Sequence, residues 1–174
     1  INFSGGEPEI EPSRDVVALA LDAAAAAGVV PVVAAGNDYS ELGAGSVASP
    51  SNSARAISVG AVDVGGTPTK RVHAGFSSVG PTTISHRLKP DVAAPGVAVL
   101  SSVDGDWAAL SGTSMAAPHV AGAAGLLVQR HAFDPQLFAN IATTYNHIQN
   151  DGKRSMTARL LADAGVKQQL TSGG

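Results

Sequence analysis

Cysteine is absent from the 174-residue chain. This absence excludes a disulfide framework, a thiolate metal site and a cysteine nucleophile. Charged residues make up 14% of the chain and the net charge is −3, so no basic surface is expected for nucleic acid or an anionic membrane. Every apolar stretch is interrupted by glycine, proline or charge well short of the length that crosses a bilayer. The sequence therefore predicts a soluble protein with neither a nucleic-acid nor a membrane partner.

What the chain does contain is enough for one domain with a buried core, because 44% of its residues are apolar. It begins at Ile1 and shows no charged segment followed by an apolar one, which a signal peptide would require. We therefore expect the natural N-terminus to lie upstream of Ile1.

Hydrophobic patterns predict alternating helices and strands. A helix with Ser13 as its N-cap and Asp15 in its first turn is expected to end at Gly28. A second, longer helix starts at Thr113 or Ser114 and reaches about Arg130. Three short apolar runs rich in β-branched residues are typical of parallel strands buried on both faces: 29–35, 56–62 and 97–103. The predicted fold class is α/β, with three layers and a mostly parallel sheet.

The strongest local signal is residues 112–122, GTSMAAPHVAG. Ser114 lies where a loop enters a helix, so free backbone N–H groups and the helix dipole favour a developing oxyanion there. Gly112 allows a substrate to approach the backbone closely. Pro118 is expected in the first helical turn, where its missing N–H has no cost. On the residues alone, a serine at a helix start is usually only a cap, so the local chemistry leaves both a cap and a nucleophile open.

A second signal is Asn37, which follows the predicted buried strand 29–35. An asparagine at the carboxyl end of a parallel strand can aim its amide N–H at the edge where α/β enzymes bind ligands. The alternative is an asparagine that merely favours a turn, since Gly36, Asn37 and Asp38 are all turn-forming residues.

Together these segments resemble the subtilisin family of serine proteases, and SVGAVD (58–63), FSSVGP (76–81) and KPDVAAPG (89–96) fit the same order. The resemblance implies that Ser114 is the catalytic nucleophile and that Asn37 donates to the oxyanion. It also implies a substrate-binding cleft for a peptide or protein. The residues that would line this cleft are Ser4, Gly5, Gly6, Ala35, Gly36 and Asp38.

In this family the acid and the base of the catalytic triad precede a Ser-x-Gly segment, which corresponds here to residues 4–6. Both are therefore expected before Ile1. The order Asp38, His73, Ser114 matches the triad order only formally. The expected partner is therefore the missing N-terminal segment of the catalytic domain, and the isolated chain is expected to be inactive. Without that segment the sheet keeps an unpaired edge, so self-association is also expected.

The resemblance covers residues 1–131, and 132–174 are assigned only as a helical tail of the same domain. It implies a secreted enzyme that requires no cofactor, with calcium as an option in the complete domain. No metal ligand is assigned in this chain. Asp91 lies near a segment where subtilisins often hold a cation, but it is expected to form local hydrogen bonds instead.

Two other functions are open. The chain could be a non-catalytic module on the subtilisin scaffold that binds extended peptide along residues 4–6, although such a binder has no chemical need for the intact GTS and Gly-Asn segments. An α/β-hydrolase esterase would require a G-x-S-x-G elbow, and Ala116 occupies its last position.

Overall fold

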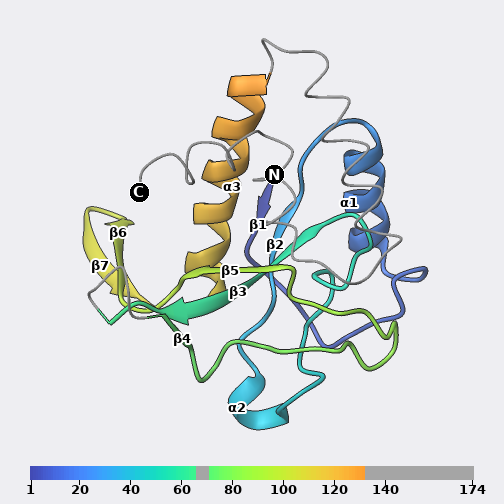
Figure 1. Cartoon of the computed structure of the whole chain (residues 1–174), viewed down its shortest axis with the longest axis horizontal. Helices are drawn as coiled ribbons and strands as arrows, with labels where there is room; N and C mark the ends of the chain where they lie inside the picture. Colours follow the sequence, from blue (N-terminus) through green and yellow to red (C-terminus); the bar gives the residue numbers. More distant parts are fainter. Residues whose placement is uncertain (66–70, 132–174) are drawn as a thin grey trace, which may run out of the picture. The chain divides into compact units, whose positions relative to one another are not determined.

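The computed structural model describes residues 1–65 and 71–131. The chain divides into two compact units, Ile1–Gly122 and Ala123–Gly174. Of the second unit, the described residues are the end of the last helix; the first unit holds every site residue predicted above. In chain order (Figure 1) the elements are β1 (Asn2–Phe3), α1 (Val16–Ala26), β2 (Val32–Ala34), α2 (Tyr39–Leu42), β3 (Ile57–Asp63), β4 (Val72–His73), β5 (Val92–Pro95), β6 (Val99–Val103), β7 (Asp106–Leu110) and α3 (Thr113–His131).

The central sheet is mostly parallel, as predicted. Strands β1, β2 and β3 are successive parallel neighbours, and β5 pairs with β3 in the same direction. The short strand β4 is antiparallel to β3. All three residues of β2 are buried, which is why its sequence is a continuous apolar run instead of an alternating one.

Helical layers cover both faces of this sheet. On one face, Leu21 of α1 packs with Val33 of β2 and Phe3 of β1. On the other face, a Cβ built on Gly96 would lie 2.6 Å from the Cβ of Ala61 and 3.3 Å from that of Ala116. Only glycine leaves room there for the start of α3 to approach β3 this closely. Strands β1 and β2 thus lie between α1 and the start of α3 (Figure 1), which confirms the three-layer α/β fold.

The predicted cap of α1 is wrong by two residues. Asp15, not Ser13, is the N-cap: its Oδ1 accepts hydrogen bonds from the backbone N of Val17 at 2.8 Å and of Ala18 at 3.1 Å. The Ser13 hydroxyl donates to the Glu11 carboxylate instead. Only 3% of the surface of Asp15 is exposed. Ser13 and Asp15 both favour helix starts, and the packing of the folded chain determines that Asp15 is the cap.

The third predicted strand, residues 97–103, is a strand, but the prediction that it is parallel and buried is wrong. Strand β6 is exposed and pairs antiparallel with β7 in a separate two-stranded hairpin. The parallel strand of this region is β5, whose sequence VAAP has weak strand propensity. The run 97–103 carries two serines and Leu100 is 66% exposed, so its branched residues reflect a hairpin and not a buried strand.

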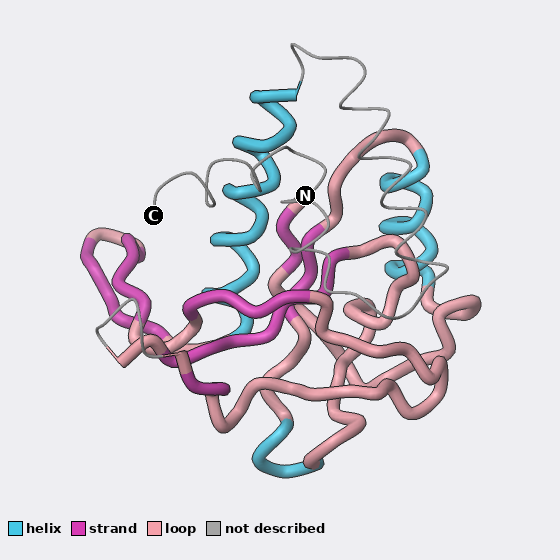
Figure 2. The backbone as a smooth tube through the Cα atoms, viewed as in Figure 1, coloured by secondary structure: helices cyan, strands magenta, loops and turns pink. Residues whose placement is uncertain are grey.

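Long loops connect these elements (Figure 2), and one of them is fixed by Glu9. Its Oε2 accepts from the backbone N and the hydroxyl of Thr83 at 2.6 and 2.8 Å and from the N of Ile84 at 2.9 Å. Its Oε1 accepts from the N and hydroxyl of Ser85. Partial burial would raise the pKa of Glu9, but the hydrogen bonds from Ile84, Thr83 and Ser85 together outweigh burial and lower it to about 2.

We expect Glu9→Gln to lower stability near neutral pH and to have no effect in strong acid. Because the folded-state pKa lies below the ordinary value of 4.5, the Glu9 contribution is complete above that value and is lost as the pH falls through about 2. Unfolding midpoints of both proteins measured from pH 6 downwards should therefore converge. Glu7→Gln, an exposed neighbour, serves as the control. A Glu9→Gln deficit that is independent of pH would contradict this account.

Candidate active site

Ser114 is the second residue of α3 and is half-buried. The residues immediately before it, Gly112 and Thr113, are buried, so the backbone N–H of Ser114 lies at the helix start beside packed neighbours. Free N–H groups at such a position attract negative charge. The helix begins at Thr113, where the sequence predicted.

Asn37 is oriented by Thr113. Its Oδ1 accepts hydrogen bonds from the Thr113 backbone N at 2.9 Å and from the Thr113 hydroxyl at 3.0 Å. Since the backbone N–H can only donate, the contacting amide atom must be the oxygen, which fixes the direction of Nδ2. Thr113 is fully buried. Sequence reasoning missed this role, although the residue sits inside the motif that identified Ser114.

Two N–H groups lie near the backbone of Gly112. A Cβ built on this glycine would stand 3.7 Å from Asn37 Nδ2 and 3.7 Å from the backbone N of Ser114. Both predicted donors thus lie near Gly112 although 76 residues separate Asn37 from Thr113, and the Met115 sulfur stands nearer still, 3.5 Å from the same Cβ position. An oxyanion hole requires two N–H donors held close together, because fixed donors need no reorganisation when the charge develops.

The predicted walls of the substrate cleft meet at Ala48. A Cβ on Gly6 would lie 3.1 Å from the Ala48 Cβ, and a Cβ on Gly36 would lie 3.2 Å from the same atom. The backbone continues this contact: Ala48 N donates to Ala35 O at 2.9 Å, and Ser49 is bridged to residue 7. Sequence reasoning missed Ala48, because a small residue in a serine-rich loop carries no functional signal.

The remaining predicted cleft residues lie around these walls. A Cβ on Gly5 would stand 3.3 Å from the ring of Phe3. Gly36 has φ +108°, and a Cβ there would lie 2.9 Å from the Ser78 hydroxyl, so a side chain fits neither the conformation nor the space. Asp38 is exposed, and its carboxylate is 3.4 Å from that same Cβ position, at the rim of the wall.

Ser4 is the one predicted cleft residue whose side chain contacts the nucleophile segment directly. Its hydroxyl lies 3.2 Å from the backbone carbonyl oxygen of Ser114. Sequence reasoning placed Ser4 in a wall of the cleft, and a contact across 110 residues has no local signature.

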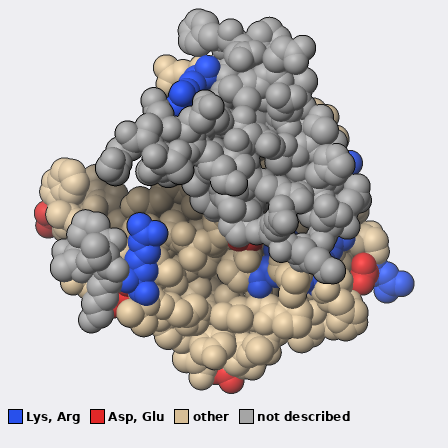
Figure 3. All heavy atoms as spheres, viewed as in Figure 1, with Lys and Arg blue, Asp and Glu red and all other residues tan. Residues whose placement is uncertain are grey.

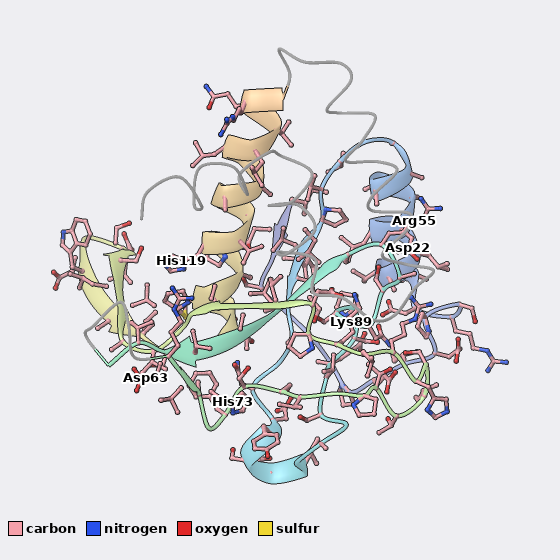
Figure 4. The ribbon with its side chains drawn as sticks, viewed as in Figure 1. Asp22, Arg55, Asp63, His73, Lys89 and His119 are labelled. Carbon is pink, nitrogen blue, oxygen red and sulfur yellow. The ribbon has the colours of Figure 1, made fainter. Side chains whose placement is uncertain are left out.

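Two histidines of the described chain, His73 and His119, contact backbone carbonyl oxygens. His119 Nδ1 lies 2.8 Å from Met115 O on its own helix. His73 Nε2 lies 3.0 Å from Ser77 O, and its ring packs edge-on against Tyr39. Figure 4 shows His73 and His119 on separate elements. Within residues 1–65 and 71–131, no hydrogen bond joins a histidine to the Ser114 hydroxyl or to Asp38, so the formal Asp38–His73–Ser114 order has no geometric support.

Asp91 forms the local bonds that the sequence predicted. Its Oδ2 accepts from Lys89 Nζ at 2.7 Å and from the backbone N of Ser58 at 2.8 Å. The Lys89 ammonium thus supplies the positive charge beside this carboxylate (Figure 4 labels Lys89). In the part of the chain that the structure describes, no three His, Cys, Asp or Glu side chains gather as a metal site would require.

Two surface properties complete the description of the first unit and of α3. On the face drawn in Figure 3, acidic and basic side chains of the described residues are scattered instead of gathered in one patch. No helix among the described residues is both long enough and apolar enough to cross a membrane. The predicted helical tail, residues 132–174, lies outside the described residues.

Comparison with known proteins assigns the family. The model of the subtilase family matches residues 1–165. Subtilisin NAT of Bacillus subtilis subsp. natto is 39% identical over 132 residues, which cover 75% of this chain and 31% of that protein. Subtilisin Savinase of Lederbergia lenta is 38% identical over 150 residues, 86% of this chain and 47% of that protein.

Solved structures agree with this result. The S41 psychrophilic protease superposes with a TM-score of 0.63 at 32% identity, over 75% of this chain and 43% of that one. Sphericase gives a TM-score of 0.60 at 28% identity, over 80% of this chain and 46% of that one. The chain spans less than half the length of these relatives. Sequence and structure together show that this chain belongs to the subtilase family.

Proposed function

We propose that this chain supplies the nucleophile and the oxyanion hole of a serine endopeptidase. The observation that carries the proposal is the pair of N–H donors, Asn37 Nδ2 and Ser114 N, which both lie 3.7 Å from the Cβ position of Gly112. The Ser114 hydroxyl oxygen attacks the scissile carbonyl carbon, and the carbonyl oxygen becomes an oxyanion between these donors. Collapse expels the amine, which takes the proton that the general base removed from the serine, and water then hydrolyses the acyl-enzyme to release the acid and regenerate the serine.

A serine hydroxyl needs a general base to take its proton and a carboxylate to orient that base. We propose that both come from a segment outside this chain, since His73 and His119 contact other groups and no hydrogen bond joins a described histidine to the Ser114 hydroxyl. Strand β1 supports this partner, because it pairs with β2 on one side while its other edge faces no strand of the described chain. An open strand edge of this kind readily accepts another strand.

The substrate proposed for this site is an extended polypeptide. Residues 4–6 continue from β1, so their backbone groups suit pairing with an extended chain. The adjoining walls that meet at Ala48 are built from glycine and alanine, whose small side chains let the backbone approach a substrate closely. Asp38 at the rim adds one exposed carboxylate.

The second candidate function is a non-catalytic module that binds extended peptide through the same residues. The observation that favours it is the absence, in the described chain, of a hydrogen bond between Ser114 and a histidine. Both candidates use β1 and the same walls. They differ in whether Ser114 ever becomes reactive.

A fluorophosphonate probe distinguishes them, since it reacts covalently only with an activated serine. We expect no labelling of the chain alone and labelling of Ser114 once the matching upstream segment is added, with the site located by mass spectrometry. Ser114→Ala must abolish the label, whereas Ser40→Ala, an exposed serine on α2, must leave it unchanged. Strong labelling of the chain alone would disprove the claim that the base comes from elsewhere. No labelling in either case would favour the binding module.

A further inference from the structure

Helix α3 contains a proline whose position affects the backbone hydrogen bonding of Ser114. Pro118 is the sixth residue of the helix and not in its first turn, which corrects the sequence expectation. In an α-helix the N–H of residue i bonds to the carbonyl of residue i−4. Proline has no N–H, so Pro118 cannot donate to the carbonyl of Ser114. The carbonyl deprived of its helical partner is therefore that of the nucleophile itself.

The Ser4 hydroxyl donates to this carbonyl. The distance from Ser4 Oγ to Ser114 O is 3.2 Å. Asn2 Nδ2 lies 3.2 Å from the same hydroxyl oxygen and donates to it. The hydrogen-bond directions are thus fixed: the Asn2 amide donates to Ser4 Oγ, and the Ser4 proton goes to Ser114 O, because a carbonyl can only accept.

We propose that Ser4 is a positioning residue, whose hydroxyl takes the place of the helical N–H that Pro118 lacks and holds the backbone of Ser114 in its reactive orientation. This inference rests on the proposed function, because it deepens the role of the same site. It makes the end of β1 both the strand offered to the substrate and a restraint on the nucleophile. Sequence alone assigned Ser4 only to a wall of the cleft.

The consequence for catalysis follows from where the carbonyl lies. The Ser114 residue carries one oxyanion donor on its N side and the carbonyl held by Ser4 on its C side. A backbone restrained on both sides keeps the hydroxyl and the N–H in one geometry, and small displacements of reacting groups reduce rates strongly. Without the Ser4 bond, the first turn of α3 loses a restraint that no amide of residue 118 can replace.

The first test measures stability on the chain itself and does not depend on activity. Ser4→Ala should lower the unfolding midpoint by about 2–4 °C, the shift expected for one hydrogen bond in a chain of this length. Pro118→Ala restores an N–H at residue 118, so in that background Ser4→Ala should have less than half of this effect. Ser13→Ala, an exposed serine remote from α3, provides the control. Equal effects of Ser4→Ala in both backgrounds would overturn the link between Ser4 and Pro118.

The second test measures positioning in the chain assembled with its upstream segment. Ser4→Ala should lower kcat about fivefold with KM unchanged, the factor that corresponds to one bond of about 1 kcal/mol. Ser4→Thr, which retains the hydroxyl, should restore kcat, and so should Pro118→Ala combined with Ser4→Ala. An unchanged kcat alongside a positive stability cycle would show that Ser4 is structural only and would overturn the inference.

The two tests separate this inference from the function on which it rests. If the assembled protein never reacts with a fluorophosphonate, the protease proposal fails, while the stability cycle still reports on the contact. If the protein reacts normally and the cycle shows no coupling, only the positioning role of Ser4 fails.

Discussion

Replacing Asn37 by aspartate is expected to lower kcat of the proposed assembled enzyme by about 10²–10³ while KM changes little, a magnitude that comes from a subtilisin and not from this chain. Aspartate keeps an oxygen to accept from Thr113, so the local fold is retained. It replaces the Nδ2 donor by a negatively charged oxygen, which repels the oxyanion. Because the interaction is made mainly in the transition state, the loss belongs in kcat.

The measurement is steady-state hydrolysis of a peptide substrate, with substrate concentrations on both sides of KM. Ser40→Ala, exposed on α2, serves as the nearby control and should leave both constants unchanged. A loss confined to KM would mean that Asn37 binds the ground state and does not stabilise the oxyanion. Equal activity of Asn37→Asp and the unmodified enzyme would remove Asn37 from the site.

The second large effect is on stability: Asp91→Ala is expected to lower the free energy of unfolding by about 3–5 kcal/mol. The side chain of Lys89 is 5% exposed, and its ammonium bonds to Asp91 and to the carbonyl of Ala56. Removal of the carboxylate leaves a buried charge without its counterion. It also removes the acceptor for the Ser58 N–H at the start of β3.

Urea unfolding of the isolated chain measures this effect. The matched double variant, Asp91→Leu with Lys89→Met, removes both charges and should recover most of the lost stability, because an apolar pair can replace a buried ion pair at little cost. Arg55→Met, an exposed cation at the same end of β3, is the control and should be close to neutral. If the double variant were as unstable as Asp91→Ala, the loss would not come from the unpaired ammonium.

The sequence predicted the features that depend on residues close together in the chain, and it missed those that depend on contacts between distant residues. Strands β2 and β3 and the start of α3 were predicted correctly, because local apolar patterns and the motif around Ser114 are properties of consecutive residues. Strand β5 was not predicted, since VAAP becomes a strand only through its pairing with β3.

Site residues divide in the same way. Asn37 and Gly36 carry strong local signals at the end of a buried strand, and the structure brings them to the segment before Ser114. Thr113, Ala48 and the contact made by Ser4 were found only in the structure. Each acts through a neighbour more than ten residues away, and no pattern within a short window records such a contact.

The contact between Ser4 and Ser114 spans 110 residues, and those between Thr113 and Asn37 span 76. Contacts so distant along the chain close large loops, and they form late because the loss of chain entropy precedes the gain. We therefore expect the contacts of Ser4 with Ser114 and of Thr113 with Asn37 to form only when the parallel sheet is complete. The proposed oxyanion hole is therefore not assembled while the chain is still unfolded and open to cleavage.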